Sequence, residues 1–89
     1  MFTIYAIKSI KHKFIYVGIT ENLENRIRRH NSGFNHSTKA FAPYYLFYTE
    51  TAENGILARQ REIYLKSSSG KRFLNKILLE FDNINKTKY

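Results

Sequence analysis

The sequence predicts an α+β fold (an α/β sandwich), in which three helices flank a small, largely antiparallel sheet of three strands. Two β-prone segments separated by a short turn indicate a hairpin, an aromatic run after a proline indicates a third strand, and apolar residues spaced at three and four indicate helices. The expected order β-β-α-β-α-α occupies residues 2–8, 13–19, 21–31, 44–49, 52–66 and 71–81. A chain of 89 residues with 43% hydrophobic residues can form one modest core. We therefore expect a single domain over residues 1–81 and a flexible C-terminal tail over residues 82–89.

The hairpin should place two tyrosines on one face of the sheet. If it turns at Ile10 and Lys11, Tyr5 lies directly across from Tyr16, because cross-strand pairs share a constant sum of residue numbers. A slip of two residues would separate the pair but keep both hydroxyls on the same face, since side chains alternate with a period of two.

The helix over residues 21–31 has one stripe, roughly 100° wide, that should face the sheet. It consists of Leu23, Arg26, Ile27 and His30. Arg26 and His30 are thus directed toward the protein, while Arg28 and Arg29 point elsewhere. A guanidinium in that position needs a partner or a ligand, because desolvating it alone is costly. The alternative is a pair of side chains at the edge of the core that extend to solvent.

The loop over residues 31–40 lacks apolar periodicity and contains His36 and Lys39. These side chains would contact phosphate if the loop borders a site, and are otherwise solvated. The third helix is strongly amphipathic, with Asn75 off the centre of its apolar stripe, facing solvent or the mouth of a cleft.

Glu62, in the helix over residues 52–66, lies on a stripe with Ala58 rather than among charges. Such a carboxylate is suited to a metal ion. The alternative is a surface glutamate paired with Arg59 or Lys66, an ordinary arrangement at spacings of three and four.

The composition favours an anionic partner. Fifteen Lys and Arg against seven Asp and Glu give a formal charge of +8, which suits nucleic acid or an anionic membrane surface. The absence of cysteine excludes disulfides, thiolate nucleophiles and the common structural zinc sites. With no membrane-spanning stretch and no leader pattern at the N-terminus, we expect a cytoplasmic protein without a membrane partner.

Several short motifs, taken in order, resemble the GIY-YIG nucleases, specifically their small single-domain bacterial type. They are Thr3-Ile4-Tyr5, Tyr16-Val17-Gly18, Asn22-Leu23-Glu24-Asn25-Arg26, His30-Asn31-Ser32-Gly33, Ser37-Thr38-Lys39, Pro43-Tyr44, and Ala58 with the stretch from Glu62 to Gly70. The resemblance extends from Phe2 to about Leu79. Thr3 and Val17 depart from the signature, in place of a glycine and an isoleucine.

The resemblance implies a metal-dependent DNA endonuclease and gives each site residue a role. Tyr5 and Tyr16 would position and activate the attacking water, Arg26 would bind the scissile phosphate, and His30 would transfer a proton or support the site. Glu62 would hold one Mg²⁺ or Mn²⁺. Gly18 and Asn75 are supporting candidates.

The basic candidates for nucleic-acid contact are Arg28, Arg29, His36, Lys39 and Lys71. A protein partner or a homodimer would supply specificity. A non-catalytic, basic nucleic-acid-binding module on the same fold is the main alternative function. A membrane-surface protein is a third, but no helix combines a basic face with an unused apolar one.

Overall fold

The computed structural model describes residues 1–86, and the side chains of residues 1–84. The elements are β1 (Phe2–Ser9), β2 (Ile15–Thr20), α1 (Leu23–Asn31), a short 3₁₀ helix η1 (Lys39–Phe41), β3 (Tyr44–Ala52), α2 (Gly55–Lys66) and α3 (Ser68–Lys86). Apart from the short η1 turn, this is the predicted order of strands and helices, so the α+β prediction is confirmed.

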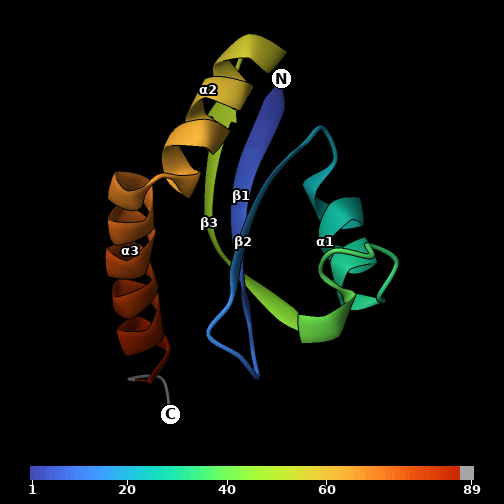
Figure 1. The fold of residues 1–89 in the computed structure, drawn as a ribbon, viewed down its shortest axis with the longest axis vertical. Helices are drawn as coiled ribbons and strands as arrows, with labels where there is room; N and C mark the ends of the chain where they lie inside the picture. The colour runs from blue at the N-terminus through green and yellow to red at the C-terminus, as the bar shows by residue number, and fades with distance from the viewer. Residues whose placement is uncertain (87–89) are drawn as a thin grey trace.

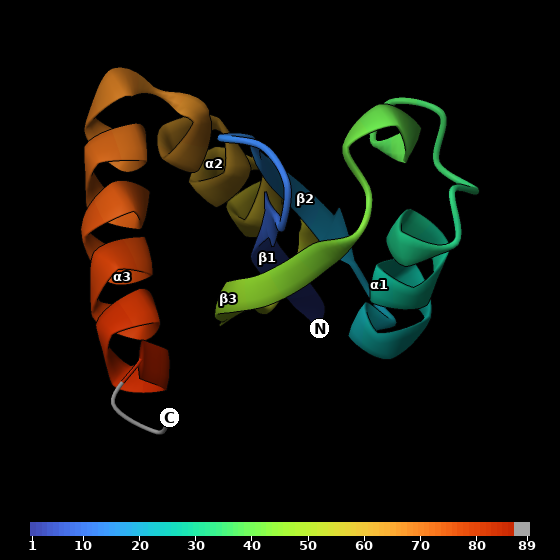
Figure 2. The same cartoon turned by 90° about the horizontal axis from the view of Figure 1, so that it is seen from below.

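The three strands form an antiparallel sheet in the order β2-β1-β3, with β1 in the centre. Helix α1 covers one face, and α2 and α3 cover the other, as Figures 1 and 2 show from two directions. Alternation along β1 therefore divides its side chains between two clusters. Tyr5 and Ile7 pack on the α1 side, whereas Ile4 and Ala6 pack on the α2 and α3 side.

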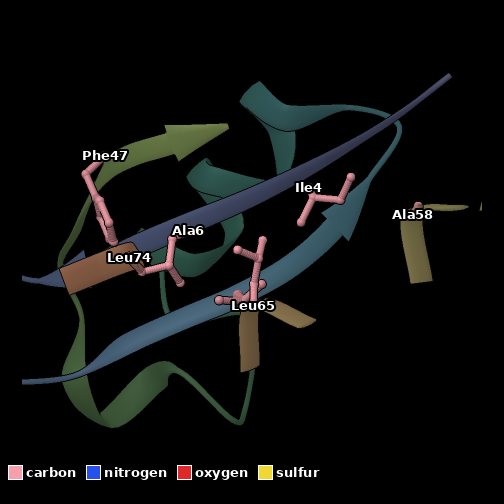
Figure 3. Close-up of a cluster of buried hydrophobic side chains, with 7 residues drawn as sticks. Ile4, Ala6, Phe47, Ala58, Leu65 and Leu74 are labelled. Atoms are coloured by element: carbon pink, nitrogen blue, oxygen red, sulfur yellow. The ribbon is translucent and has the colours of Figure 1, made fainter. Parts of the chain in front are cut away.

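The larger cluster lies between the sheet and the two C-terminal helices (Figure 3). Its buried members are Ile4, Ala6, Val17, Phe47, Ala58, Leu65 and Leu74. Gly70 permits the close approach of the two helices: a Cβ there would lie 2.1 Å from the Tyr64 carbonyl oxygen and 2.4 Å from Leu65 Cα. The helix break is thus confined to Ser67, and the rest of the predicted break at residues 68–70 is the first turn of α3.

The predicted direct pairing of Tyr5 with Tyr16 across the hairpin is wrong. Tyr5 lies across from Gly18, and Ile7 lies across from Tyr16, a slip of two residues. The reason is a longer turn closed by Ser9, whose side-chain oxygen accepts hydrogen bonds from the amides of Lys11 and His12. Because the slip is two, both tyrosines stay on one face, with ring centroids 6.3 Å apart.

Two asparagines cap the helices, which begin slightly later than predicted. The Asn22 side chain accepts from the amide of Asn25 at 3.1 Å, so α1 begins at Leu23 rather than at residue 21. Asn54 does the same for α2 through the amide of Leu57 at 2.9 Å.

Helix α3 continues to Lys86, so the predicted helix end near residue 81 is wrong, whereas the flexibility of the C-terminal segment stays a prediction. Asp82 accepts a hydrogen bond from the Tyr45 hydroxyl at 3.1 Å, and Phe81 stacks on the Tyr45 ring. These contacts to β3 extend the helix into a segment that shows no apolar periodicity. Residues 87–89 of the predicted tail lie outside the described residues. No helix in the described part of the chain is long and apolar enough to cross a membrane.

Candidate active site

A hydrogen bond between Tyr5 and His30 lies at the centre of the site. The Tyr5 hydroxyl is 2.7 Å from His30 Nε2, and both side chains are fully buried between β1 and α1. Tyr16 joins them from β2, with its ring centroid 4.9 Å from that of His30. The predicted inward stripe of α1 is confirmed: His30 is buried and Arg26 is half-buried, while Arg28 and Arg29 are exposed.

Gly18 makes room for the tyrosines. A Cβ on Gly18 would lie 2.5 Å from the Tyr5 hydroxyl oxygen, 2.7 Å from Tyr5 Cζ and 3.0 Å from Tyr16 Cε1. The Tyr5 ring thus lies directly over the backbone of its cross-strand neighbour. Its supporting role is steric, because any side chain would occupy the space of the Tyr5 hydroxyl.

The surroundings of Tyr5 keep its hydroxyl protonated. Burial, and then the neighbouring Tyr16, raise the pKa of Tyr5 to about 12, although the Arg26 guanidinium beside it acts in the opposite direction. The negative charge of Glu62 also raises the pKa of Tyr5, so the carboxylate on α2 lies within electrostatic range of the hydroxyl. The fold therefore brings Tyr5, Tyr16, Arg26 and His30 together, whereas Glu62 acts on Tyr5 only through its charge, from α2.

The surroundings of His30 favour its neutral form, and both of its ring nitrogens make hydrogen bonds. Burial, and then the Arg26 charge, lower the pKa of His30. On the far side of the ring, Nδ1 lies 2.8 Å from the Thr38 hydroxyl oxygen and 3.2 Å from the Asn35 amide nitrogen. Thr38 itself donates to the Asn35 carbonyl at 3.4 Å. Because Thr38 gives its own proton to the Asn35 carbonyl, its oxygen can accept from Nδ1–H. With the tautomer assigned in this way, Nε2 accepts from Tyr5 and from the Asn35 amide, whose nitrogen lies 3.5 Å from it.

Thr38 and Asn35 are contacts of His30 that sequence reasoning missed. Both lie in the loop between α1 and β3, which has no periodicity that would predict the direction of a side chain. Thr38 is fully buried, and its carbonyl accepts a hydrogen bond from the Tyr44 hydroxyl at 2.7 Å. The loop is thereby anchored to the start of β3.

The buried neutral histidine predicts a pH dependence of folding. The unfolded chain binds a proton near pH 6.5 at this residue, whereas the folded chain binds it only at lower pH. The free energy of unfolding should therefore fall as pH is lowered below 6.5. Urea titrations between pH 7.5 and 5 would measure this slope. In a His30→Gln variant the slope should be shallower, and an unchanged slope would contradict the prediction.

Glu62 has the surface pairs that its spacing also allowed. Its carboxylate accepts from Arg59 at 3.3 Å and from Lys66 at 3.2 Å, and only 12% of its side chain is exposed. The two basic partners are 71% and 52% exposed. Both are therefore free to turn toward solvent or toward a phosphate.

The donor set around Glu62 fits a single hard divalent cation. Within the described residues, no group of three or more His, Cys, Asp or Glu side chains occurs. Protein side chains alone would therefore not fill the coordination sphere of a metal ion at Glu62. Mg²⁺ commonly retains water and binds one or two carboxylates together with substrate phosphate oxygens. Glu62, with 12% of its side chain exposed, would supply one such carboxylate, and water and substrate would supply the remaining oxygens.

The remaining candidates lie around the site rather than in it. Asn75 and Lys71 are exposed on α3, where they border the same groove as Tyr16. Arg28 and Arg29 line a hollow of about 470 Å³ on the outside of α1, in which Arg29 lies over the Phe34 ring. His36 and Lys39 are exposed in the loop after α1. These basic residues therefore lie on at least two separate surfaces.

Comparison with known proteins defines the class. A family model described as the GIY-YIG catalytic domain matches residues 1–77, and the chain therefore belongs to this family of nucleases. It is also similar to the UPF0213 protein CPE1444 of Clostridium perfringens (strain 13 / Type A). The two are 41% identical over 64 residues, covering 71% of this chain and 68% of the relative. No solved structure matches the chain significantly.

Proposed function

We propose that the chain is a metal-dependent endonuclease that hydrolyses phosphodiester bonds in DNA, using Tyr5, Tyr16, Arg26, His30 and Glu62 with one Mg²⁺ or Mn²⁺. The observation that supports this most strongly is the hydrogen bond of 2.7 Å between the Tyr5 hydroxyl and a neutral His30, beside the Arg26 guanidinium. In this proposal His30 would be the proton acceptor and Arg26 the phosphate ligand, and the chain belongs to a nuclease family.

Tyr5 and His30 act as a pair in deprotonating the water. A phenol with a pKa of about 12 is fully protonated at neutral pH, so its hydroxyl is not by itself a base. Neutral His30 supplies the basic nitrogen. Because the Tyr5 side chain is fully buried in the free protein, substrate binding must first open the space beside its hydroxyl. As the water oxygen then attacks phosphorus, its proton passes to the Tyr5 oxygen and the phenolic proton passes to His30 Nε2. Tyr16, beside both rings, orients the water.

Arg26 and Glu62 act on the phosphate. The guanidinium binds the nonbridging oxygens, where negative charge increases as the water oxygen bonds to phosphorus and the bond to the leaving oxygen breaks. The leaving oxygen takes its proton from solvent. Glu62 would hold the divalent cation, which when bound would stabilise the same charge as a Lewis acid. Arg59 and Lys66 exchange their contact with Glu62 for solvent or phosphate. Asn75 lies on the side of α3 facing Tyr16, where it would contact the leaving group.

The test is a cleavage screen with Mg²⁺ or Mn²⁺ over single-stranded, duplex, nicked, flapped and branched DNA, with matched RNAs. Glu62→Gln and Arg26→Ala should each lower the single-turnover rate by about 100-fold or more, because each removes a charge at the phosphate. The controls are Glu80→Gln and Arg72→Ala, which remove the same charges from exposed positions on α3. Equal loss in the controls, or cleavage that survives in the site variants, would refute the assignment.

The runner-up is a binding module on the same fold without turnover. The observation in its favour is that the Glu62 carboxylate is paired with Arg59 and Lys66. Such a protein would bind nucleic acid equally well in EDTA and in Mg²⁺ and would cleave none of the substrates. Specificity in either case would come from a protein partner or from a homodimer, which sedimentation of the purified protein with and without DNA would detect.

A further inference from the structure

A groove of about 890 Å³ lies where the beginning of β2 faces the junction of α2 and α3. Strand β2 forms one edge of the sheet, so this side of the strand is not paired with another strand. The groove is lined by Phe14 to Val17 of the β2 segment, by Leu65 and Lys66 of α2, and by Lys71, Leu74, Asn75 and Leu78 of α3, with Lys8 and Lys13 at the hairpin. Tyr16, Lys66 and Asn75, already placed at or next to the proposed phosphate site, belong to this lining. The side chains of Tyr5, Arg26, His30 and Glu62 do not.

The charge of the groove has a single sign. Four lysines and no acidic residue line it. Lys66 is paired with Glu62, and Lys8 donates to the Ser9 carbonyl at 2.7 Å. Lys13 and Lys71 are exposed and have no ion pair with any acidic residue in the described part of the chain. Unpaired cations around a concave surface attract and concentrate a polyanion.

The floor of the groove is apolar. Leu65 and Leu74 are buried beneath it, and the half-buried side chains of Ile15 and Leu78 continue it. A cationic rim over an apolar floor suits a nucleic-acid strand, whose phosphates take the rim while sugars and bases pack on the floor. An anion without apolar groups would leave the floor wet.

The groove is also continuous with the proposed catalytic residues. Tyr16 lines it and lies beside His30 on its other side. Lys66 lines it and contacts Glu62 at 3.2 Å. Two of the side chains that border the phosphate site therefore also border the groove.

We propose that this groove binds the segment of the cleaved nucleic-acid strand that flanks the scissile phosphate, with Lys13 and Lys71 contacting successive phosphates on its two walls. The proposal rests on the proposed function for its direction, because the scissile phosphate lies at Arg26. It also assigns a binding role to Lys13, which the sequence alone did not single out. An acidic peptide adding to the free edge of β2 is the competing occupant, and it would use the backbone of the edge rather than lysines on α3.

The test measures binding without turnover. Fluorescence anisotropy in EDTA would compare wild type with Lys13→Gln/Lys71→Gln. The labelled DNA and RNA strands would have lengths of 4, 8 and 12 nucleotides, which lie within the range of about 4–16 nucleotides that small strand-binding domains cover. The matched control is Arg72→Gln/Lys76→Gln. It also removes two positive charges, both from α3, the helix of Lys71, at positions that do not line the groove.

The groove variant should bind the longer strands about tenfold more weakly at 0.1 M salt. The slope of its log binding constant against log salt concentration should become shallower by about two, because two phosphate contacts are lost. The control should stay within about twofold of wild type. Lys13→Arg/Lys71→Arg should keep wild-type affinity, which separates lost charge from altered folding. An equal loss of affinity for DNA and RNA strands would show that the groove contacts the phosphate backbone. A larger loss of affinity for one of them would identify that nucleic acid as the substrate.

Three results would overturn the proposal. They are equal weakening in the control, no dependence on strand length in wild type, and displacement of the strand by polyglutamate at the same charge concentration as by unlabelled strand. Failure of the proposed function looks different. In that case no substrate is cleaved with Mg²⁺ or Mn²⁺, while the groove variant still binds more weakly than its control.

Discussion

Replacing Gly18 with alanine is expected to lower the cleavage rate by about 10³-fold or more. The new Cβ would lie 2.5 Å from the Tyr5 hydroxyl oxygen and 3.0 Å from Tyr16 Cε1. Tyr5 cannot move aside without losing its hydrogen bond to His30, because both side chains are fully buried. Displacing a reacting group by about 1 Å can cost about 10²-fold, and here two tyrosines are displaced together.

The same substitution should cost about 1–3 kcal/mol of stability, the usual range for adding a methyl group to a packed interior. Single-turnover cleavage and thermal unfolding would measure the two effects. Gly55→Ala is the matched control, because a Cβ there has only the Phe2 ring for a neighbour, at 3.9 Å. A Gly18→Ala protein with wild-type rate and melting temperature would show that Tyr5 does not need its present position.

Replacing Tyr5 with phenylalanine is expected to lower the rate by up to about 10⁴-fold with little change in packing. The ring remains over Gly18, but the oxygen that transfers a proton from water to His30 Nε2 is lost. General acid and base groups contribute about 10²–10⁴-fold. His30 Nε2 is left buried without its partner, so a loss of about 1–3 kcal/mol in the free energy of unfolding should accompany the change.

The pH profile distinguishes the proton relay from a structural role of Tyr5. Because neutral His30 is the acceptor, the wild-type rate should rise with pH through the lowered pKa of His30 and then level off. In Tyr5→Phe this rise of the rate with pH should disappear, because no hydroxyl remains to pass the proton of the water to His30. Tyr44→Phe is the control, because its hydroxyl donates to the Thr38 carbonyl and only anchors the loop. A Tyr5→Phe protein that keeps the wild-type rise would refute the relay.

Local patterns in the sequence were enough to predict the elements and the direction of most site residues. Spacing at three and four placed Arg26 and His30 on the sheet-facing side of α1, and alternation placed Tyr5 and Tyr16 on one face of the hairpin. Both rules depend only on backbone geometry within one segment. They tolerate errors in register, which is why a slip of two residues left the tyrosines together.

The tertiary structure decided the contacts between separate segments, because the spacing of residues within one segment does not specify them. The Thr38 hydroxyl reaches His30 Nδ1 because the loop after α1 folds back, and its polar sequence contains no signal of that path. Glu62 comes within range of Tyr5 from the other layer of the fold, and Lys71 comes to face β2 from the start of α3. Helix α3 continues past Phe81 because Asp82 bonds to Tyr45 on β3. The sequence thus determined which residues point inward, whereas the packing of separate segments determined which of them meet.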